Sequence, residues 1–505
     1  MTRRVALPVV LAVAALASPG AALAASPPFV RFDGAAAGDL AGASVSSAGD
    51  VNGDGHTDVI IGAPFAGRTA DGSAGGAAYI VYGPFVPGTV VDLATLGDGG
   101  VVVTGMPGQS AGHSVAAAGD VNGDGLDDVL VGAPAATPGQ ESPQTLRGAA
   151  YIVFGGRTLP HSLSLANLGR GGIVLRGASH RFPDVFGWDV APIGDVNRDG
   201  LADVAIAAPG NPGFEDSYTR GRAYVVYGRR EPGTIDMARL GHAGFRIGDT
   251  GPAQLTSVTT AGDWNADGRP DIAVADGLAL HGRGAVYVVY GRGSSHAVDL
   301  AHLGSGGVVI AGGAVHYRLM GADLAGGQDV DGDHRPDLLV GTPGAHSSAL
   351  TPPAGGVRIV RGARSAATVD LRNPGTRAWE LRGVRGWMAG SAVALGHLNA
   401  GRRADAVTVA RQSLSIVYGS SAKTALQLSP TPPQGVGLFI DGPALEPPLP
   451  PQPPLITNAR TGGFASVAVV TDLNRDGRDE LLAGAVDAGH NDRARAGAAY
   501  LLFSS

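Results

Sequence analysis

The chain has 505 residues, a formal charge of −7 at pH 7 and no cysteine. A negative balance without basic clusters argues against nucleic acid or an anionic membrane surface as a partner. Because disulfides are excluded, we expect stability to come from a large core, from bound metal, or from both.

The first 24 residues have the three parts of a secretory signal peptide. Arg3 and Arg4 form the charged region, residues 5–17 are apolar, and residues 22–24 form a small-residue cleavage site. The paired arginines leave both the general and the twin-arginine export routes open. No later stretch reaches the ~18 apolar residues that a membrane-spanning helix needs. We therefore expect cleavage after Ala24 and a secreted, extracellular domain over residues 25–505, without a membrane span.

An acidic phrase recurs seven times along this domain, which indicates a repeat protein. The phrase starts at Asp50, Asp120, Asp195, Asp263, Asp329, His397 and Asp472, at spacings of 66–75 residues, and the copy at His397 is degenerate. We place the repeats at about 29–83, 101–155, 173–228, 245–291, 308–362, 379–419 and 437–505.

Each repeat predicts four short strands between glycine-rich turns. In the first copy these are a strand around Ser44-Val45, "DVIIGAP" from Asp58, "AYIVYG" at 78–83 and "VVVTG" at 101–105. Helical periodicity is scarce, so the chain is predicted to be all-β. Seven units of four strands predict a seven-bladed β-propeller.

A count of strands predicts how the ring closes. The sequence has seven third strands but only six fourth strands after them, the last being "LFIDG" at 438–442. The segment "FVRFDG" at 29–34 supplies the missing one. We therefore predict that the N-terminal strand completes the last blade and leaves no open sheet edge.

The acidic phrase has the chemistry of a calcium loop. Counted from its first aspartate, positions 1, 3 and 5 offer side-chain oxygens, position 7 a backbone carbonyl, and position 9 a carboxylate. Calcium takes about 6–8 oxygen ligands, and glycine at position 6 permits the sharp turn. An EF-hand is excluded because position 12 is Ile61 or Val131 in the first two copies. The alternative is a run of Asx-turns that uses Asp and Asn only for backbone hydrogen bonds.

The phrase "GDVNGDG…D…GAP" resembles the FG-GAP repeat of the integrin α-subunit propeller and its bacterial relatives. The FG pair survives as Phe186-Gly187, and GAP stands at 62–64 and 132–134. The resemblance covers about 29–505. It implies calcium between the first two strands of a blade on one face, and partner binding on the opposite face.

Carried over by position, the resemblance implies about six calcium sites. The side-chain ligands would be Asp50, Asn52, Asp54, Asp58; Asp120, Asn122, Asp124, Asp128; Asp195, Asn197, Asp199, Asp203; Asp263, Asn265, Asp267, Asp271; Asp329, Asp331, Asp333, Asp337; and Asp472, Asn474, Asp476, Glu480. The carbonyl ligands would be His56, Leu126, Leu201, Arg269, Arg335 and Arg478. In the fifth copy His334 replaces the turn glycine. The sixth, "HLNAGRRAD", lacks carboxylates at positions 1 and 5, and we expect it to be metal-free.

Two classes of function remain open. A monomeric, non-catalytic binding or adhesion module for an extracellular protein or glycan fits acidic groups that keep to metal-loop offsets. An exported hydrolase or polysaccharide lyase with a site in the propeller mouth is the alternative. "GHSVA" at 112–116 resembles a nucleophile elbow, but its sister "GASVS" at 42–46 is only the first strand of a repeat. The chemistry of phospholipase D relatives in this family resembles that of a separate zinc-dependent domain.

The variable loops opposite the metal loops are the expected binding surface. Side-chain types that favour interfaces stand there at Arg181, Phe182, Phe214 and Tyr218. The proline-rich insert at 443–456 is either an extended surface arm or a tolerated long loop.

Overall fold

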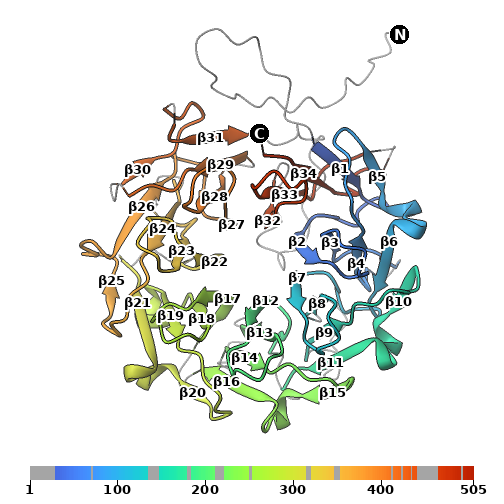
Figure 1. Cartoon of the computed structure of the whole chain (residues 1–505), viewed down its shortest axis with the longest axis horizontal. Helices are drawn as coiled ribbons and strands as arrows, with labels where there is room; N and C mark the ends of the chain where they lie inside the picture. Colours follow the sequence, from blue (N-terminus) through green and yellow to red (C-terminus); the bar gives the residue numbers. More distant parts are fainter. Residues whose placement is uncertain are drawn as a thin grey trace.

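The computed structural model describes residues 29–504 except 70–71, 135–146, 179–183, 211–220, 249–252, 314–319, 346–352, 411–412, 422–424, 434, 441–463 and 491–492. Seven sheets stand in a ring around a central axis (Figure 1). The predicted seven-bladed β-propeller is confirmed. The predicted signal segment 1–24 and the proline-rich insert 443–456 lie outside the described residues.

Each blade has four antiparallel strands, which follow chain order from the axis outward except that the outer strand of the last blade is the first strand of the chain. The first strands are β2 (Ser44–Gly49), β7 (Val115–Gly119), β12 (Asp189–Gly194), β17 (Leu255–Gly262), β22 (Leu324–Gln328), β27 (Val393–Gly396) and β32 (Ser466–Val470). The second strands are β3 (Asp58–Ala63), β8 (Asp128–Ala133), β13 (Asp203–Ala208), β18 (Asp271–Asp276), β23 (Asp337–Gly341), β28 (Asp405–Ala410) and β33 (Glu480–Ala485).

The outer strands complete the blades. The third strands are β4 (Ala77–Val81), β9 (Ala149–Val153), β14 (Arg222–Val226), β19 (Ala285–Val289), β24 (Gly356–Val360), β29 (Ser413–Val417) and β34 (Ala498–Leu502). The fourth strands are β6 (Gly100–Thr104), β11 (Gly172–Arg176), β16 (Gly244–Gly248), β21 (Gly307–Ala311), β26 (Ala378–Arg382), β31 (Gly437–Ile440) and β1 (Phe29–Asp33).

The hydrophobic core lies between neighbouring blades. Every residue of β3 and β8 is buried, because each strand is covered on both faces. One cluster joins Ile60 and Ile80 of the first blade to Val129 of the second. The strands covered on both faces therefore read as unbroken apolar runs, and not as alternating patterns.

The GAP and FG glycines mark the closest approach between blades. A Cβ on Gly62 would lie 2.1 Å from the backbone oxygen of Gly112 in the next blade. Gly112 itself has a φ of +82°, which side-chain-bearing residues rarely adopt. These two glycines let the first two blades touch through their backbones.

The N-terminal strand closes the ring as predicted. β1 pairs antiparallel with β34 in a five-residue ladder from Phe29↔Leu502 to Asp33↔Ala498. Val30 and Phe32 are fully buried in the cluster between the last and first blades. Arg493 donates to Asp92 at 2.6 and 3.0 Å and to the Gly34 carbonyl at 3.0 Å. The predicted repeats, which begin with this strand, are therefore offset by one strand from the blades.

Six blades carry a fifth, parallel strand that was not predicted. It comes from the segment leading to the next blade's fourth strand. These strands are β5 (Val90–Asp92), β10 (Ser162–Ser164), β15 (Gly233–Asp236), β20 (Val298–Asp299), β25 (Val369–Asp370) and β30 (Leu426–Gln427). Their signal is the recurring phrase "VDLATLG" at 91–97, "IDMARLG" at 235–241 and "VDLAHLG" at 298–304.

The remaining described elements are short turns of helix. Asp92 caps the first of them by accepting a hydrogen bond from Ala94 at 3.0 Å. They are η1 (Leu93–Thr95), η2 (Gly97–Gly99), η3 (Leu165–Asn167), η4 (Gly169–Gly171), η5 (Met237–Arg239), η6 (Leu300–His302), η7 (Gly304–Gly306) and α1 (Ala279–Gly282).

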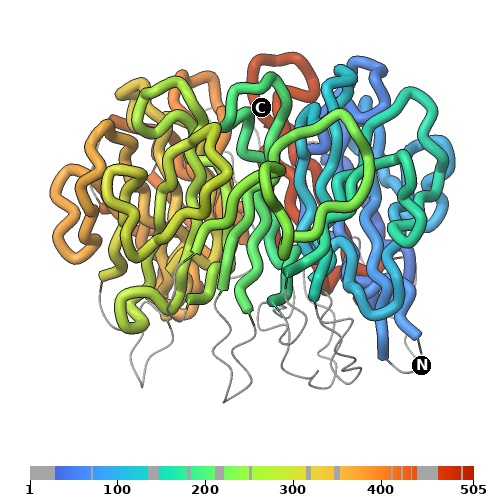
Figure 2. Tube along the Cα trace, turned by 90° about the horizontal axis from the view of Figure 1, so that it is seen from below, coloured from blue at the N-terminus to red at the C-terminus, as the bar shows by residue number. Residues whose placement is uncertain are grey.

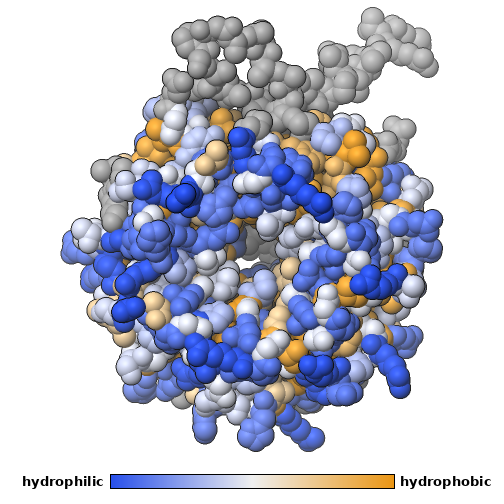
Figure 3. Space-filling view, in the orientation of Figure 1, coloured by the Kyte–Doolittle hydropathy of each residue, from blue (hydrophilic) through white to orange (hydrophobic). Residues whose placement is uncertain are grey.

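The first strands line a central channel of about 450 Å³. The space-filling view shows its opening at the centre of the ring (Figure 3). Side chains at its wall accept hydrogen bonds from the next blade. Ser44 Oγ accepts from the Val115 amide at 3.0 Å, and Asp323 Oδ2 accepts from the Val393 amide at 2.8 Å. The Ser-Val pair of the repeat is thus an inter-blade link.

Two of these wall residues are aspartates. Asp189 accepts from Ser114 at 3.1 Å and from the Val258 amide at 3.0 Å. Burial raises the pKa of Asp323 to about 7, and the charge of Asp189 adds to this effect, while hydrogen bonds from Val393 and Leu324 oppose it. An ionised Asp323 is therefore a destabilising element at the channel wall.

The first prediction tests ring closure. Deleting residues 29–34 removes a five-residue ladder and exposes the edge of β34, which favours aggregation. Loss of the buried Phe32 ring alone should cost about 3–5 kcal/mol. We expect thermal melting to show a large loss of stability. The control is deletion of residues 444–456 from the proline-rich insert, and equal melting temperatures for the two deletions would contradict the closure.

The second prediction concerns pH. Folded Asp323, with its pKa of about 7, binds more protons between pH 4 and 7 than the unfolded chain, so its contribution to stability falls as pH rises through that window. Asp323→Asn should therefore gain stability relative to the parent between pH 5 and pH 8, measured by urea denaturation at constant calcium. A difference in unfolding free energy that does not change with pH would refute this role.

Candidate metal-binding loops

The seven acidic loops join first to second strands, so they lie on one face of the ring. In an antiparallel blade the loops between second and third strands lie at the opposite end. The side view in Figure 2 shows the two faces that the strand ends define. The acidic loops are therefore separated from the ends of the strands that the second-to-third-strand loops join.

The position 1 aspartate organises the turn in the first five loops. In the first copy Asp50 Oδ1 accepts from the amides of Gly53 at 2.8 Å and Asp54 at 3.0 Å. Its Oδ2 accepts from the Gly55 amide at 2.9 Å. The second copy repeats these bonds around Asp120. One carboxylate therefore fixes three successive backbone amides.

Positions 3 and 5 continue the pattern. Asn52 Oδ1 accepts from the Asp54 amide at 2.9 Å, and Asp54 Oδ1 accepts from the His56 amide at 2.8 Å. The Asn52 amide also donates to Asp54 Oδ2 at 2.9 Å. Copies two, three, four and seven share this arrangement. This backbone conformation is compatible both with a calcium loop and with a run of Asx-turns.

Position 9 ties the acidic loop to the third strand in the first six blades. Asp58 is fully buried, and its two oxygens accept from the amides of Val51 at 3.0 Å and Gly83 at 2.9 Å. It thereby ties the start of the loop to the end of the third strand. Asp405 makes the equivalent bonds to Leu398 and Gly419 in the sixth blade, where the other acidic positions are lost. The role of position 9 in the fold is therefore independent of metal.

Burial makes these position 9 carboxylates costly to ionise. It raises the pKa of Asp58 to about 7; hydrogen bonds from Gly83 and Val51 lower it, and the charges of Asp54 and Asp50 raise it further. Glu480 in the seventh copy is raised to about 7 in the same way. A divalent cation among these oxygens would relieve both burial and repulsion.

The seventh loop offers oxygens that fit a cation. Among the described residues, Asp472 Oδ1 and Glu480 Oε1 are buried acceptors without a hydrogen-bond partner. Two uncompensated anionic oxygens at positions 1 and 9 of one loop are the donors that calcium prefers. The residues at hand therefore fit the ion that the sequence predicts.

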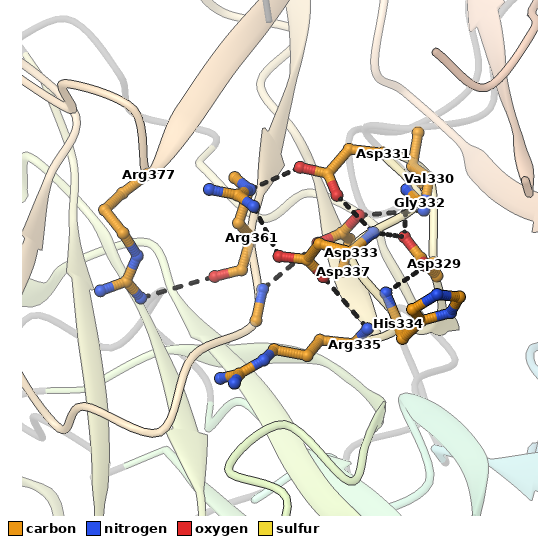
Figure 4. Close-up of polar contacts among 11 residues, drawn as sticks. Asp329, Val330, Asp331, Gly332, Asp333, His334, Arg335, Asp337, Arg361 and Arg377 are labelled. Atoms are coloured by element: carbon orange, nitrogen blue, oxygen red, sulfur yellow. Dashed lines mark hydrogen bonds and ion pairs between the residues drawn. The ribbon is translucent and has the colours of Figure 1, made fainter. Parts of the chain in front are cut away.

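The fifth and sixth loops differ from the rest. In the fifth, the oxygens of Asp329, Asp331 and Asp333 lie within 4.8 Å of one another, the one such acidic group among the described residues. Arg361 lies against this group (Figure 4). In the sixth, the Asn399 amide donates to both oxygens of Asp405, at 2.8 and 2.9 Å.

The FG-GAP repeat family matches four segments, at residues 41–81, 111–153, 186–226 and 320–360. Each match runs from the FG position to the third strand and contains one acidic loop. This chain contains FG-GAP repeats. The matches fall on blades one, two, three and five, while the ring of seven blades comes from the structure.

The FG-GAP chain resembles integrin α-subunits over part of its length. It is 36% identical to mouse integrin alpha-7 over 172 residues, covering 34% of this chain and 13% of the relative. It is 30% identical to integrin alpha-PS2 of Drosophila melanogaster over 230 residues, 44% of this chain and 14% of the relative. It is also 31% identical to rat phosphatidylinositol-glycan-specific phospholipase D over 166 residues, 31% of this chain and 18% of the relative. The chain thus spans less than a fifth of each relative.

Three further features predicted from the sequence concern the interface residues, the elbow-like motif and membrane-spanning helices. The four expected interface residues, Arg181, Phe182, Phe214 and Tyr218, lie outside the described residues. Ser114 of the elbow-like "GHSVA" accepts from the Val190 amide at 3.2 Å as part of the inter-blade links. No helix in the described part of the chain is long and apolar enough to cross a membrane.

The third prediction separates the scaffold from the metal. Asp405→Ala should leave the buried amides of Leu398 and Gly419 unsatisfied, at a cost of about 1–3 kcal/mol each. The loss should be the same with calcium and with chelator, as measured by urea denaturation. The matched variant Asp128→Ala should lose more in calcium than in chelator. An Asp405→Ala protein as stable as the parent would overturn the assignment of position 9.

Proposed function

We propose that this chain is a secreted, calcium-stabilised, non-catalytic binding module that recognises an extracellular protein or glycan. The observation that carries the calcium part is the pair of partnerless buried oxygens of Asp472 and Glu480. The repeated positions 1, 3, 5, 7 and 9 supply the same donor set in the first four loops. Calcium in these loops would neutralise the buried carboxylates and hold the loop to the second and third strands.

The similarity to integrin alpha-7 and integrin alpha-PS2 supports binding over catalysis. The side chains that resemble a hydrolase site are engaged in the fold. His113 Nδ1 lies 3.0 Å from the Trp188 carbonyl, and Ser114 Oγ donates to Asp189. In the acidic loops, the carboxylates keep the sequence spacing of calcium ligands. The binding surface in this proposal is the face opposite these loops.

Removal of calcium should destabilise the protein. Extracellular calcium modules have dissociation constants of about 10⁻⁴–10⁻³ M, so each filled site adds about 0.4–1.4 kcal/mol at 1 mM calcium. We expect the melting temperature to fall on chelation and to recover with calcium. A melting temperature that is unaffected by chelation would refute calcium stabilisation.

The partner should bind the face opposite the calcium loops. The experiment probes a protein and glycan array with and without chelator, then compares two variants against any partner found. Replacing Arg181, Phe182, Phe214 and Tyr218 by alanine should abolish binding while calcium stoichiometry and melting temperature stay nearly unchanged. If binding survives that variant but is lost in Asp124→Ala and Asp199→Ala, the metal face is the interface.

A further inference from the structure

The fifth loop departs from the repeat at a residue outside the loop as well as within it. Position 3 is Asp331, where the other six copies have asparagine, and position 6 is His334. Arg361 stands just before the glycine that ends the third strand. The equivalent residues in the other blades are all aromatic: Tyr82, Phe154, Tyr227, Tyr290, Tyr418 and Phe503.

Arg361 and Asp331 contact each other. Arg361 Nε donates to Asp331 Oδ2 at 2.5 Å, and its Nη2 donates to Asp333 Oδ2 at 2.5 Å (Figure 4). The side chain of Asp331 is 1% exposed and that of Arg361 is 19% exposed, so water screens the pair weakly. One guanidinium therefore bridges positions 3 and 5 of the loop through two charge-assisted hydrogen bonds, one to each carboxylate.

Arg361 pairs with Oδ2 of Asp331 and Oδ2 of Asp333, while the Oδ1 atom of each residue accepts from a backbone amide of the loop. Asp331 Oδ1 accepts from the Asp333 amide at 3.1 Å, and Asp333 Oδ1 accepts from the Arg335 amide at 3.1 Å. Asp329 uses both oxygens on amides of the loop, including that of His334 at 2.7 Å. A calcium ion would need the Oδ2 atoms of Asp331 and Asp333, and both are paired with a cation already.

Net charge does not distinguish the fifth loop from the first as a calcium site. The first loop has three carboxylates, Asp50, Asp54 and Asp58, whereas the fifth has four, Asp329, Asp331, Asp333 and Asp337. Arg361 brings the fifth loop back to the same net charge, since four negative charges less one leave three. The geometry decides, because calcium would have to break two partly buried ion pairs before it reached its ligands.

We propose that the fifth loop takes its cation from its own chain: the Arg361 guanidinium takes the place of calcium, and the loop binds no calcium. The proposal rests on calcium binding by the other intact loops. It reduces the expected sites from six to five and leaves the fifth loop ordered without metal. The Asn-to-Asp change at position 3 and the aromatic-to-Arg change at the third strand then act as one coupled substitution.

A reciprocal exchange of residues tests the coupling. Asp331→Asn with Arg361→Tyr places at these two positions the residue types of the first blade, Asn52 and Tyr82, and it should add one bound calcium. Asn122→Asp with Phe154→Arg installs the pair in the second loop, and it should remove one. Bound calcium is counted by equilibrium dialysis of the full secreted chain with radioactive calcium at millimolar concentration, and each variant is melted to confirm folding.

A second variant keeps the test decisive if the double variant fails to fold. Arg361→Gln removes the guanidinium, keeps all four carboxylates and should also add one calcium. A parent that binds five ions, with gains in both fifth-loop variants, supports the proposal. A parent count that these variants leave unchanged overturns it while calcium binding by the other loops stands. If parent and variants alike bind no calcium, the proposed function is overturned, and with it the premise of this exchange.

Discussion

The buried aspartate at the start of the second strand, present in six of the seven blades, is the interaction on which the rest of the blade depends. It joins the first residues of the acidic loop to the glycine after the third strand, as Asp58 does with Val51 and Gly83. The loop is thereby held at both ends. The sixth blade retains the clamp through Asp405 although it lacks the carboxylates at positions 1 and 5, so the clamp does not depend on them.

Backbone contacts and hydrogen bonds join neighbouring blades around the axis. Gly62 and Gly112 let the first two blades meet backbone to backbone, and Ser44 accepts from the next blade at the channel wall. β1 then pairs with β34, so that the two ends of the described chain lie in one sheet. Parallel fifth strands such as β5 bond each repeat to the blade before it. The face that carries the loops is therefore rigid, which is what a preformed ion site and a binding scaffold both need.

Much of this fold could be predicted from the sequence because the signals are local and repeated. The spacing of the acidic phrase counts the blades, and the shortage of fourth strands assigns residues 29–34 to the last blade. The fifth strands escaped prediction because they have only two to four residues and pair in parallel with a distant partner. The clamp at position 9 escaped as well, because the sequence shows neither the burial of Asp58 nor its two amide donors. Arg361 is separated by 28 residues from Asp333, so only the folded blade shows that the two meet.

The most direct measurement is a crystal structure of residues 25–505 grown in millimolar calcium, with anomalous scattering recorded at a wavelength where calcium contributes strongly. The account predicts five anomalous peaks, in the loops that start at Asp50, Asp120, Asp195, Asp263 and Asp472, and a guanidinium against Asp331 and Asp333 in the fifth loop. Fully ordered loops without these peaks would contradict calcium binding, and a peak among Asp329, Asp331 and Asp333 would contradict the place given to Arg361.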